Sequence, residues 1–559
     1  MRGQGRTAAL LVGAVLWATA CSTGPVARPG SSASEPVPGG HLVDYQNFSA
    51  GDVTHIDPAL AEVLEGMQPA MLIFDGLTDY DYRTGELKAA VAESWASNDD
   101  ATVWTFTLRR GVTFSNGDPV LPSDFKFAWE RAASRALASI QGYHFTDTLR
   151  IRGAAAVADG SAAEMSGLRA DDGAMTLTVE LEAPISFAPA VVAHVAFSPV
   201  PRRIVSALPD QRKWEEGAMI GNGPFRMAEP RRPGESVRLV RNETYWGGVN
   251  GHLAYLDSIE FRMSQDQDSA WAAFEAGQGD IGRIPPARYG DTRARYPGRT
   301  AEQPINVVYF YTFNSADPVV GGPQNVKLRQ AISMAIDKQK IVDDLYSGAR
   351  QVATGLTMPG IPGFRAGLSQ YSGGDLARAR QLLADWESET GRTAAGLPPL
   401  KLNFGSGSGH DLIATIIQSN LRDIGVRSEL DPRDPRSYFS EMRQGQGQLL
   451  RAGWGADYNV YDNQLFPLFH SSQAGPGGSN FAQYRSTRFD DLVAQARRTT
   501  DEGRRVALYH EAESVLLNED TIVIPLNWYS GTIAWSDRLE GVVQSALGFV
   551  AYDEMWFSR

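Results

Sequence analysis

Helical and strand patterns alternate along the C-terminal half of this 559-residue chain, and this alternation constrains the fold more than any other feature. Apolar residues fall at helical spacing in three stretches, within residues 328–336, 376–386 and 412–424. Short apolar runs that are typical of buried strands occupy residues 400–404 and 522–526. The pattern predicts an α/β fold with a mixed sheet in this half of the chain.

The N-terminal half shows strand patterns and one clear helix. Residues 103–109 and 176–181 alternate apolar and polar side chains, which predicts half-buried strands. Ser123 or Asp124 is expected to cap a helix that continues to Ala136. The length of the chain exceeds one compact core, so we expect two to four domains.

A secretion signal and a lipid anchor are predicted at the N-terminus. Arg2 and Arg6 precede an apolar run at residues 8–20, which is too short to span a bilayer. The run ends in small residues before Cys21, which resembles a bacterial lipobox, with Ala18 where that pattern prefers leucine. The chain has one cysteine. We therefore interpret residues 1–20 as a lipoprotein signal peptide and Cys21 as the lipidated residue rather than a catalytic thiol.

Residues 21–40 are rich in serine, proline and glycine, and we expect them to form a flexible tether. No later segment reaches eighteen consecutive apolar residues, so the sequence predicts no membrane-spanning helix. The net charge of −13 and the lack of a basic block argue against a nucleic-acid partner. An acidic surface is compatible with a cationic or zwitterionic ligand.

Motifs for catalysis are not evident in the sequence. The eight histidines are scattered, and no two have metal-ligand spacing. The glycine- and serine-rich residues 405–410 do not fit a nucleophile elbow, and no phosphate-binding loop or dinucleotide fingerprint occurs. We therefore predict no enzyme, no cofactor and no metal site, although an extracellular hydrolase stays open as an alternative.

One polar and aromatic stretch, residues 451–459, follows a short apolar run. It contains a base, Arg451, an acid, Asp457, and two large rings, Trp454 and Tyr458. A carboxylate, a guanidinium and ring faces are what a site for a zwitterion needs. The alternative is a strand-to-loop junction that holds a structural Arg–Asp pair.

Short motifs also follow one another in a fixed order from about residue 42 onward. They are Asp57-Pro58, Phe74-Asp75-Gly76-Leu77, Ala92-Glu93-Ser94-Trp95, Phe114-Ser115-Asn116-Gly117-Asp118-Pro119, Gly221-Asn222-Gly223-Pro224-Phe225, Tyr245-Trp246, and Arg329-Gln330-Ala331 with Ala335-Ile336-Asp337-Lys338. In this order they resemble the extracellular solute-binding proteins of family 5, which are the oligopeptide- and dipeptide-binding proteins of ABC importers.

The resemblance implies a two-lobed α/β body of the periplasmic-binding-protein type II fold, with an extra domain and a ligand cleft between the lobes. Lobe I would combine residues 41–82, 217–302 and 531–559. Residues 83–216 would form the extra domain, and residues 303–530 would form lobe II. A hinge of crossing strands would let the lobes close on a ligand.

The resemblance also implies roles for individual residues. Asp457 would pair with the α-amino group of a peptide, Trp454 would form a pocket wall, and Arg451 would meet a carboxylate. Tyr143 would be a ring that covers the peptide. The other residues expected at the ligand are Tyr458, Asn459, Asn480, Tyr484 and Glu65, the last of which adjoins Gly66, where some members place an acid.

The function implied is that of a monomeric substrate-binding lipoprotein, anchored to the cell membrane through Cys21 on its extracytoplasmic side. It would capture oligopeptides and deliver them to the permease and ATPase subunits of an ABC importer, without a cofactor. Two alternatives stay open. The same fold could bind a non-peptide amino-acid-like or guanidinium metabolite, or it could serve as a peptide-sensing receptor module.

Overall fold

The computed structural model describes residues 35–47, 55–217, 219–232, 234–250, 254–264, 266–407, 409–476 and 478–558. Cys21, the expected signal peptide and most of the expected tether lie outside these residues. The C-terminal end of the expected tether is held against the folded body by hydrogen bonds. The backbone N–H of Gly39 donates to the carbonyl of Tyr255 at 2.8 Å, and that of Gly40 donates to Asp257 Oδ2 at 3.0 Å.

A six-stranded sheet combines segments from both ends of the chain, all of which lie in the residues expected to form lobe I. Its strands, in spatial order, are β18 (Ile533–Trp535), β11 (Ile281–Arg283), β1 (His41–Asn47), β10 (Ser258–Ser264), β9 (Ser236–Arg241) and β8 (Phe225–Met227). β1 runs parallel to both β10 and β11. Helix α6 (Gln267–Glu275) packs against β1 and β11, and its Trp271 and Phe274 belong to a small buried cluster with Ala534 of β18.

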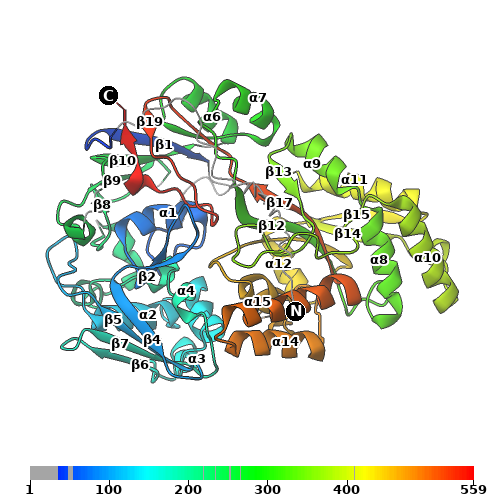
Figure 1. Cartoon of the computed structure of the whole chain (residues 1–559), viewed down its shortest axis with the longest axis horizontal. Coiled ribbons are helices and arrows are strands. Elements are labelled where there is room, and N and C mark those ends of the chain that lie inside the picture. Colours follow the sequence, from blue (N-terminus) through cyan, green and yellow to red (C-terminus); the bar gives the residue numbers. More distant parts are fainter. Residues whose placement is uncertain are drawn as a thin grey trace, which may run out of the picture. The chain divides into compact units, whose positions relative to one another are not determined.

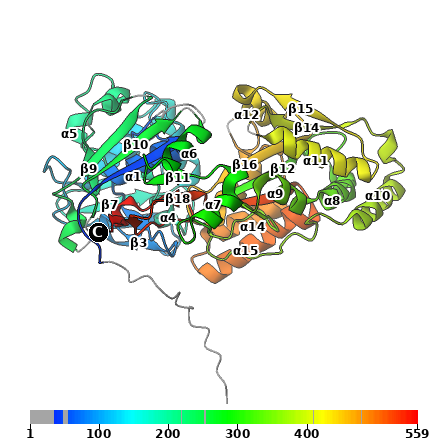
Figure 2. The same cartoon turned by 90° about the horizontal axis from the view of Figure 1, so that it is seen from above.

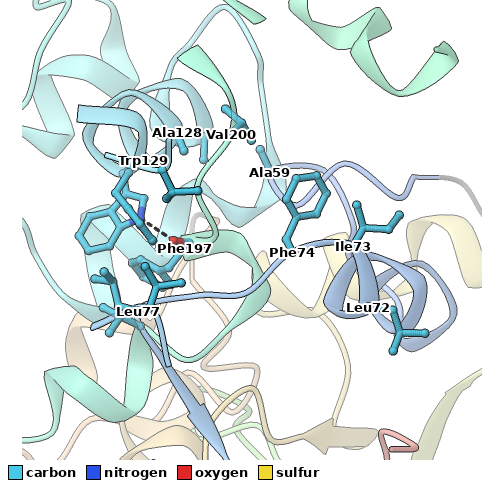
Figure 3. Close-up of a cluster of buried hydrophobic side chains, with 14 of the residues drawn as sticks. Ala59, Leu72, Ile73, Phe74, Leu77, Ala128, Trp129, Phe197 and Val200 are labelled. Atoms are coloured by element: carbon cyan, nitrogen blue, oxygen red, sulfur yellow. Dashed lines mark hydrogen bonds between the residues drawn. The ribbon is translucent and has the colours of Figure 1, made fainter. Parts of the chain in front are cut away.

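A four-stranded antiparallel sheet follows, in the order β4 (Ala92–Ser97), β5 (Val103–Leu108), β7 (Thr176–Glu180) and β6 (Leu168–Asp171). The predicted strands β5 and β7 are confirmed. α2 (Pro122–Ala133) packs against this sheet, and its Trp129 Nε1 donates to the carbonyl of Phe197 at 2.8 Å (Figure 3). The prediction that Ser123 or Asp124 is the N-cap was wrong, because the N-cap is Leu121. Asp124 lies inside the helix, and its side chain accepts the N–H of Leu121 at 2.9 Å.

The third sheet lies in the residues expected to form lobe II. Its six strands are β13 (Arg350–Val352), β17 (Val523–Ser530), β12 (Pro304–Phe313), β16 (Leu449–Gly455), β14 (Leu400–Gly405) and β15 (Ser428–Arg433). β12 is antiparallel to β16 and β17, whereas β14 is parallel to β15 and β16, so the predicted mixed sheet is confirmed. Alternate side chains of β12 enter the hydrophobic cores on the two faces of the sheet.

The α-helices of the described chain are α1 (Leu64–Ile73), α2, α3 (Ala154–Asp159), α4 (Ala188–Val191), α5 (Arg202–Val205), α6, α7 (Tyr289–Arg295), α8 (Val326–Ala335), α9 (Lys338–Tyr346), α10 (Leu376–Thr390), α11 (His410–Asp423), α12 (Pro435–Arg443), α13 (Asp462–Phe469), α14 (Thr487–Arg498) and α15 (Glu502–Ser514). Figures 1 and 2 both show α11 alongside β14 and β15. The three predicted amphipathic helices correspond to α8, α10 and α11.

Shorter elements complete the fold. Two hairpins pair β2 (Thr78–Tyr80) with β3 (Leu87–Ala89) and β19 (Leu539–Glu540) with β20 (Trp556–Phe557). Short helical turns that matter below are η1 (Ile140–Gly142), η2 (His144–Thr148), η3 (Val195–Phe197) and η11 (Tyr552–Glu554). The β2–β3 hairpin spans the expected boundary between residues 82 and 83, and the predicted domain boundaries stay predictions.

Two chain segments cross between the lobes side by side. One leads from Arg299 into β12, and the other joins β17 to β18. The N–H of Gly531 donates to the carbonyl of Gln303 at 2.8 Å, and the N–H of Ala301 donates to the carbonyl of Ile533 at 2.9 Å. The lobes are thus joined by a pair of hydrogen-bonded strands, which is the geometry of a hinge.

Candidate functional site

The end of strand β16 positions the candidate ligand residues. Leu449, Leu450 and Ala452 are fully buried, and β16 lies between β12 and β14 in the middle of the lobe II sheet. The strand ends at Gly455, and the following loop reaches α13, which begins at Asp462. A loop held at both ends by buried elements presents its polar side chains in a fixed orientation.

Asp457 is a half-buried carboxylate whose hydrogen-bond partners are all neutral. Its Oδ2 accepts from the hydroxyl of Tyr143 at 2.7 Å and from Asn463 Nδ2 at 3.4 Å. Its backbone N–H donates to Asn463 Oδ1 at 3.2 Å. Within the described residues, no lysine, arginine or histidine lies at ion-pair distance from Asp457. The carboxylate can therefore accept a cationic group from a ligand.

Tyr143 joins the extra-domain region to lobe II through this bond. It lies between η1 and η2, and its ring packs on His144 at 4.1 Å between centroids. Burial and the neighbouring Asp457 raise the pKa of Tyr143 well above its usual value. The phenol thus keeps its proton and acts as a donor to the carboxylate. Sequence position alone does not predict this bond, because 314 residues separate the two partners.

Trp454 is half-buried beside the same asparagine. Its Nε1 donates to Asn463 Oδ1 at 2.8 Å, which is the oxygen that also accepts the N–H of Asp457. Asn463 is 1% exposed and holds both residues in place. No motif in the sequence singles it out, because its role depends on how the loop folds back onto α13.

Arg451 lies in a second group of polar and aromatic side chains on lobe II. Its guanidinium carbon is 4.5 Å from the centre of the Tyr309 ring, and Arg350 approaches the same ring at 6.0 Å. The hydroxyl of Tyr309 lies 3.2 Å from His410 Nδ1. Burial and the two arginines lower the pKa of His410 to about 4, so the imidazole is neutral at pH 7. Sequence reasoning missed Arg350, Tyr309 and His410.

Neither arginine of this group is paired with a carboxylate in the described part of the chain. Arg350 donates to Asn527 Oδ1 at 3.2 Å, and Arg451 Nε is buried without a hydrogen-bond partner among the described residues. Two guanidinium groups beside a neutral imidazole form a positive site. Such a site can receive a carboxylate or another small anion.

Tyr458 and Asn459 have structural contacts. Tyr458 is 2% exposed and stacks on Phe187 with ring centroids 6.1 Å apart. The N–H of Asn459 donates to the hydroxyl of Tyr80 at 3.2 Å, and its Oδ1 accepts from Asn306 Nδ2 at 2.8 Å. Asn459 also lines the two cavities described below. Both residues thus hold the Asp457 loop against the neighbouring elements.

The structure does not bring the remaining predicted residues to Asp457. Asn480 is 1% exposed, and its side-chain amide forms hydrogen bonds with the backbone of His470 and Tyr484. Tyr484 is 3% exposed, and its hydroxyl donates to Asp520. Glu65 is half-buried in the first turn of α1 and interacts electrostatically with Arg283. Contact of these three residues with a ligand stays a prediction.

Two cavities adjoin the Asp457 loop. A small one of about 20 Å³ is lined by Asp457, His194 and Tyr82, and it has room for one water-sized group. A larger one of about 900 Å³ is lined by Phe187 and Tyr461 and has the size of a ligand pocket. The two cavities share the lining residues Tyr80, Tyr82, Gly85, Asn459 and Ala546.

The described residues hold no candidate metal centre. Among them, no three histidine, cysteine, aspartate or glutamate side chains gather closely enough to hold a metal ion. The helices within the described ranges are all too short or too polar to cross a bilayer.

Comparison with known proteins gives consistent matches over most of the chain. The profile of bacterial extracellular solute-binding proteins, family 5 Middle, matches residues 86–476. The oligopeptide-binding protein OppA of Bacillus subtilis (strain 168) is 28% identical over 498 residues, which cover 87% of each chain.

Solved structures give the same result. The murein tripeptide-binding protein MppA of Escherichia coli is 26% identical with a TM-score of 0.74, over 93% of this chain and 98% of that one. An unliganded open form of MppA gives a TM-score of 0.77 at 26% identity, over 92% of this chain and 97% of that one. These matches confirm the predicted two-lobed α/β fold.

Proposed function

Because the chain belongs to the bacterial extracellular solute-binding proteins of family 5, we propose that it captures oligopeptides between its lobes and delivers them to the permease of an ABC importer. OppA, named above, is an oligopeptide-binding protein, and MppA is a murein tripeptide-binding protein. These names support a peptide as the ligand of this chain.

The observation that carries the proposal is the half-buried carboxylate of Asp457, which has only neutral partners among the described residues. An ammonium group of a peptide supplies the missing cation. A buried ion pair adds little net affinity, because desolvation opposes the attraction, but a buried charge that loses its partner is strongly unfavourable. Asp457 therefore selects ligands with a free amino group.

The positive site around Arg451 and Arg350 provides for the other end of a ligand. A charge-assisted hydrogen bond to a carboxylate contributes about 1.5–3 kcal/mol. A zwitterionic peptide would then be held at both ends by opposite charges, and Trp454 would pack on the part between them. Side chains that face hydrated space tolerate many sequences, because water mediates their contacts.

We also propose that Cys21 carries the lipid that anchors the protein outside the cytoplasm, and that the protein acts as a monomer that binds without catalysis. Cys21→Ser would prevent lipidation. The variant should appear in the soluble extracytoplasmic fraction, whereas the parent protein should stay with the membrane and carry the added mass of a lipid. Equal membrane retention of the variant would contradict the anchor.

A small amino-acid-like or guanidinium metabolite is the second candidate ligand. It is favoured by the presence of Asp457 and Arg451 in one short stretch, since that pair recognises any small zwitterion. Such a ligand would need no strand-like backbone contacts.

Native mass spectrometry of the purified protein separates these candidates. We expect bound species whose masses and fragments identify peptides, in a ratio of one per chain, and we expect added peptides to be recovered intact. A retained compound without peptide bonds would favour the metabolite. Failure to bind any member of a free-amine tripeptide mixture would contradict the proposed function.

A further inference from the structure

A third cavity of about 360 Å³ lies beside the β2–β3 hairpin and η11. Its lining combines aromatic rings with four carboxylates and two basic side chains. The charged residues are Asp75, Asp79, Asp553, Glu554, Lys88 and Arg109. Carboxyl groups thus outnumber basic side chains in the cavity wall.

This cavity adjoins the small cavity at Asp457. The two share the lining residues Met71, Asp79, Tyr82, Ala193 and Val195. A group bound at Asp457 therefore lies close to the third cavity, within the reach of a side chain that extends from that group.

His194 lines the small cavity at Asp457. It is 6% exposed, and its Nδ1 accepts the N–H of Ala196 at 3.2 Å. The neutral ring consequently carries its proton on Nε2, which has no hydrogen-bond partner in the described part of the chain. This buried N–H in the wall of the small cavity can donate a hydrogen bond to a carbonyl oxygen of a ligand.

The basic residues near the third cavity already have partners. Lys88 Nζ lies 3.1 Å from Asp79 Oδ2, and Arg83 Nη2 lies 2.6 Å from Glu554 Oε2. Arg109 donates through Nε to the carbonyl of Ala90 at 2.9 Å. The charges of Asp79 and Glu554 are therefore neutralised by Lys88 and Arg83.

Asp75 and Asp553 are the carboxylates of this cavity left without an ion pair in the described residues. Asp75 Oδ2 accepts from Trp246 Nε1 at 2.7 Å, and burial raises the pKa of Asp75 to about 7. Burial and the neighbouring Glu554 raise the pKa of Asp553 as well. A cation that entered the cavity would stabilise the ionised form of both groups.

We infer that this cavity receives the lysine or arginine side chain of the first residue of a bound peptide, so that the protein prefers peptides with a basic amino-terminal residue. The inference rests on the proposed function, because it takes Asp457 as the partner of the peptide amino group. The inference goes beyond the proposed function by naming the chemical class of the first peptide residue. The amine anchor alone does not select that class.

Tyr82 and Tyr245 are aromatic residues of the cavity that fit the same occupant, whereas the Trp246 ring already has Arg109 at 5.8 Å from its centre. A cation over the face of a tryptophan or tyrosine ring gains about 0.5–2 kcal/mol, and the gain is larger where water is excluded. Apolar ring faces also suit the methylene groups of lysine or arginine. An acidic first side chain would instead meet Asp75 and Asp553, which repel it.

Titration calorimetry with four tripeptides tests the inference on the full chain. The peptides are Lys-Ala-Ala, norleucine-Ala-Ala, Ala-Ala-Ala and Glu-Ala-Ala, of which norleucine matches the lysine side chain closely in length without its charge. We expect Lys-Ala-Ala to bind at least about tenfold tighter than norleucine-Ala-Ala. Asp553→Asn should reduce that ratio at least about threefold.

Asp537→Asn is the matched control, because Asp537 is exposed and lines none of the cavities described above. It should keep the preference for lysine. If norleucine-Ala-Ala binds as tightly as Lys-Ala-Ala to the parent protein, the inference is overturned while peptide binding stands. If none of the four peptides binds, the proposed function fails and the inference fails with it.

Discussion

Arg350 is held more tightly than its half-buried position suggests. Its guanidinium carbon lies 3.8 Å from the centre of the Tyr346 ring and 3.6 Å from that of Tyr529. The two rings hold the charge in place without neutralising it. Arg350 can therefore act with Arg451 on one carboxylate, and this role can be tested separately from the amine anchor.

We predict that the parent protein binds tripeptide acids at least about tenfold tighter than the corresponding amides, because a charge-assisted hydrogen bond is lost with the carboxylate. Arg350→Gln should reduce this difference, and calorimetry with both peptide forms measures it. Arg378→Gln, on the exposed face of α10, is the matched control. An unchanged acid-to-amide ratio in Arg350→Gln would remove Arg350 from the site.

Asp75 gives a prediction about pH. Its pKa of about 7 means that the carboxyl is largely protonated at pH 6 and ionised at pH 8. A lysine side chain in the cavity favours the ionised form, so binding at pH 6 must displace a proton. The preference for Lys-Ala-Ala over norleucine-Ala-Ala should therefore rise by up to about tenfold from about pH 6 to pH 8.

Using the ratio of the two affinities cancels the titration of the peptide amino group, which both peptides share. The other charged groups that line the cavity are Asp79, Lys88, Arg109, Asp553 and Glu554. Asp75→Asn should weaken the pH dependence of the ratio, and Asp553, whose pKa is also raised, accounts for what is left. If the preference for Lys-Ala-Ala falls as the pH is raised from 6 to 8 in the parent protein, the predicted direction of the pH dependence is wrong.

The sequence allowed part of the site to be anticipated. Asp457, Trp454 and Arg451 lie in one short stretch, so their residue types could be considered together. Tyr143 was named through the family resemblance, but its bond to Asp457 could not be foreseen. The positive site could not be predicted because its members come from separate elements, with Arg350 on β13 and His410 on α11.

At the scale of elements, regular patterns gave reliable predictions and irregular connections did not. Alternation identified β5 and β7, and helical spacing identified α8, α10 and α11, because burial of one face imposes those periods. The start of α2 was missed because Pro122 occupies the first turn, where its lack of an N–H costs nothing. Strand order could not be derived, because the sheets join segments that lie far apart in the sequence.

Gly531 gives a prediction for the crossing strands. A Cβ at this position would lie 2.9 Å from Ala301 Cβ and 2.5 Å from Gln544 Oε1. Gly531→Ala should therefore force the two strands apart and lower the free energy of unfolding by about 1–3 kcal/mol. Urea unfolding followed by circular dichroism measures the change.

Gly290→Ala is the control for this substitution, because Gly290 lies in α7 and a Cβ there meets nothing within 4 Å. It should leave the protein equally stable or more stable by about 1 kcal/mol, since alanine favours a helix. Equal unfolding midpoints for Gly531→Ala and the parent protein would contradict the close packing at the crossing.

At the scale of the whole described body, several hydrogen bonds join lobe II to the rest of the molecule, and two of them involve the Asp457 loop. Tyr143 meets Asp457, Asn459 meets Tyr80, and Arg497 Nη2 donates to the carbonyl of Thr148 at 2.7 Å. A ligand that bonds Asp457 thus binds where side chains from both sides converge. Its binding energy can favour the closed arrangement of the lobes, which a permease would recognise.

The most direct test of this account is calorimetry of Ala-Ala-Ala and N-acetyl-Ala-Ala-Ala with the parent protein, Asp457→Asn and the exposed control Asp491→Asn. We predict that acetylation weakens binding to the parent protein and to Asp491→Asn at least about hundredfold, because it removes the charge that Asp457 accepts. Asp457→Asn should bind the free-amine peptide at least about hundredfold more weakly. Equal affinity of the parent protein for both peptides, or unchanged affinity in Asp457→Asn, would contradict the central claim.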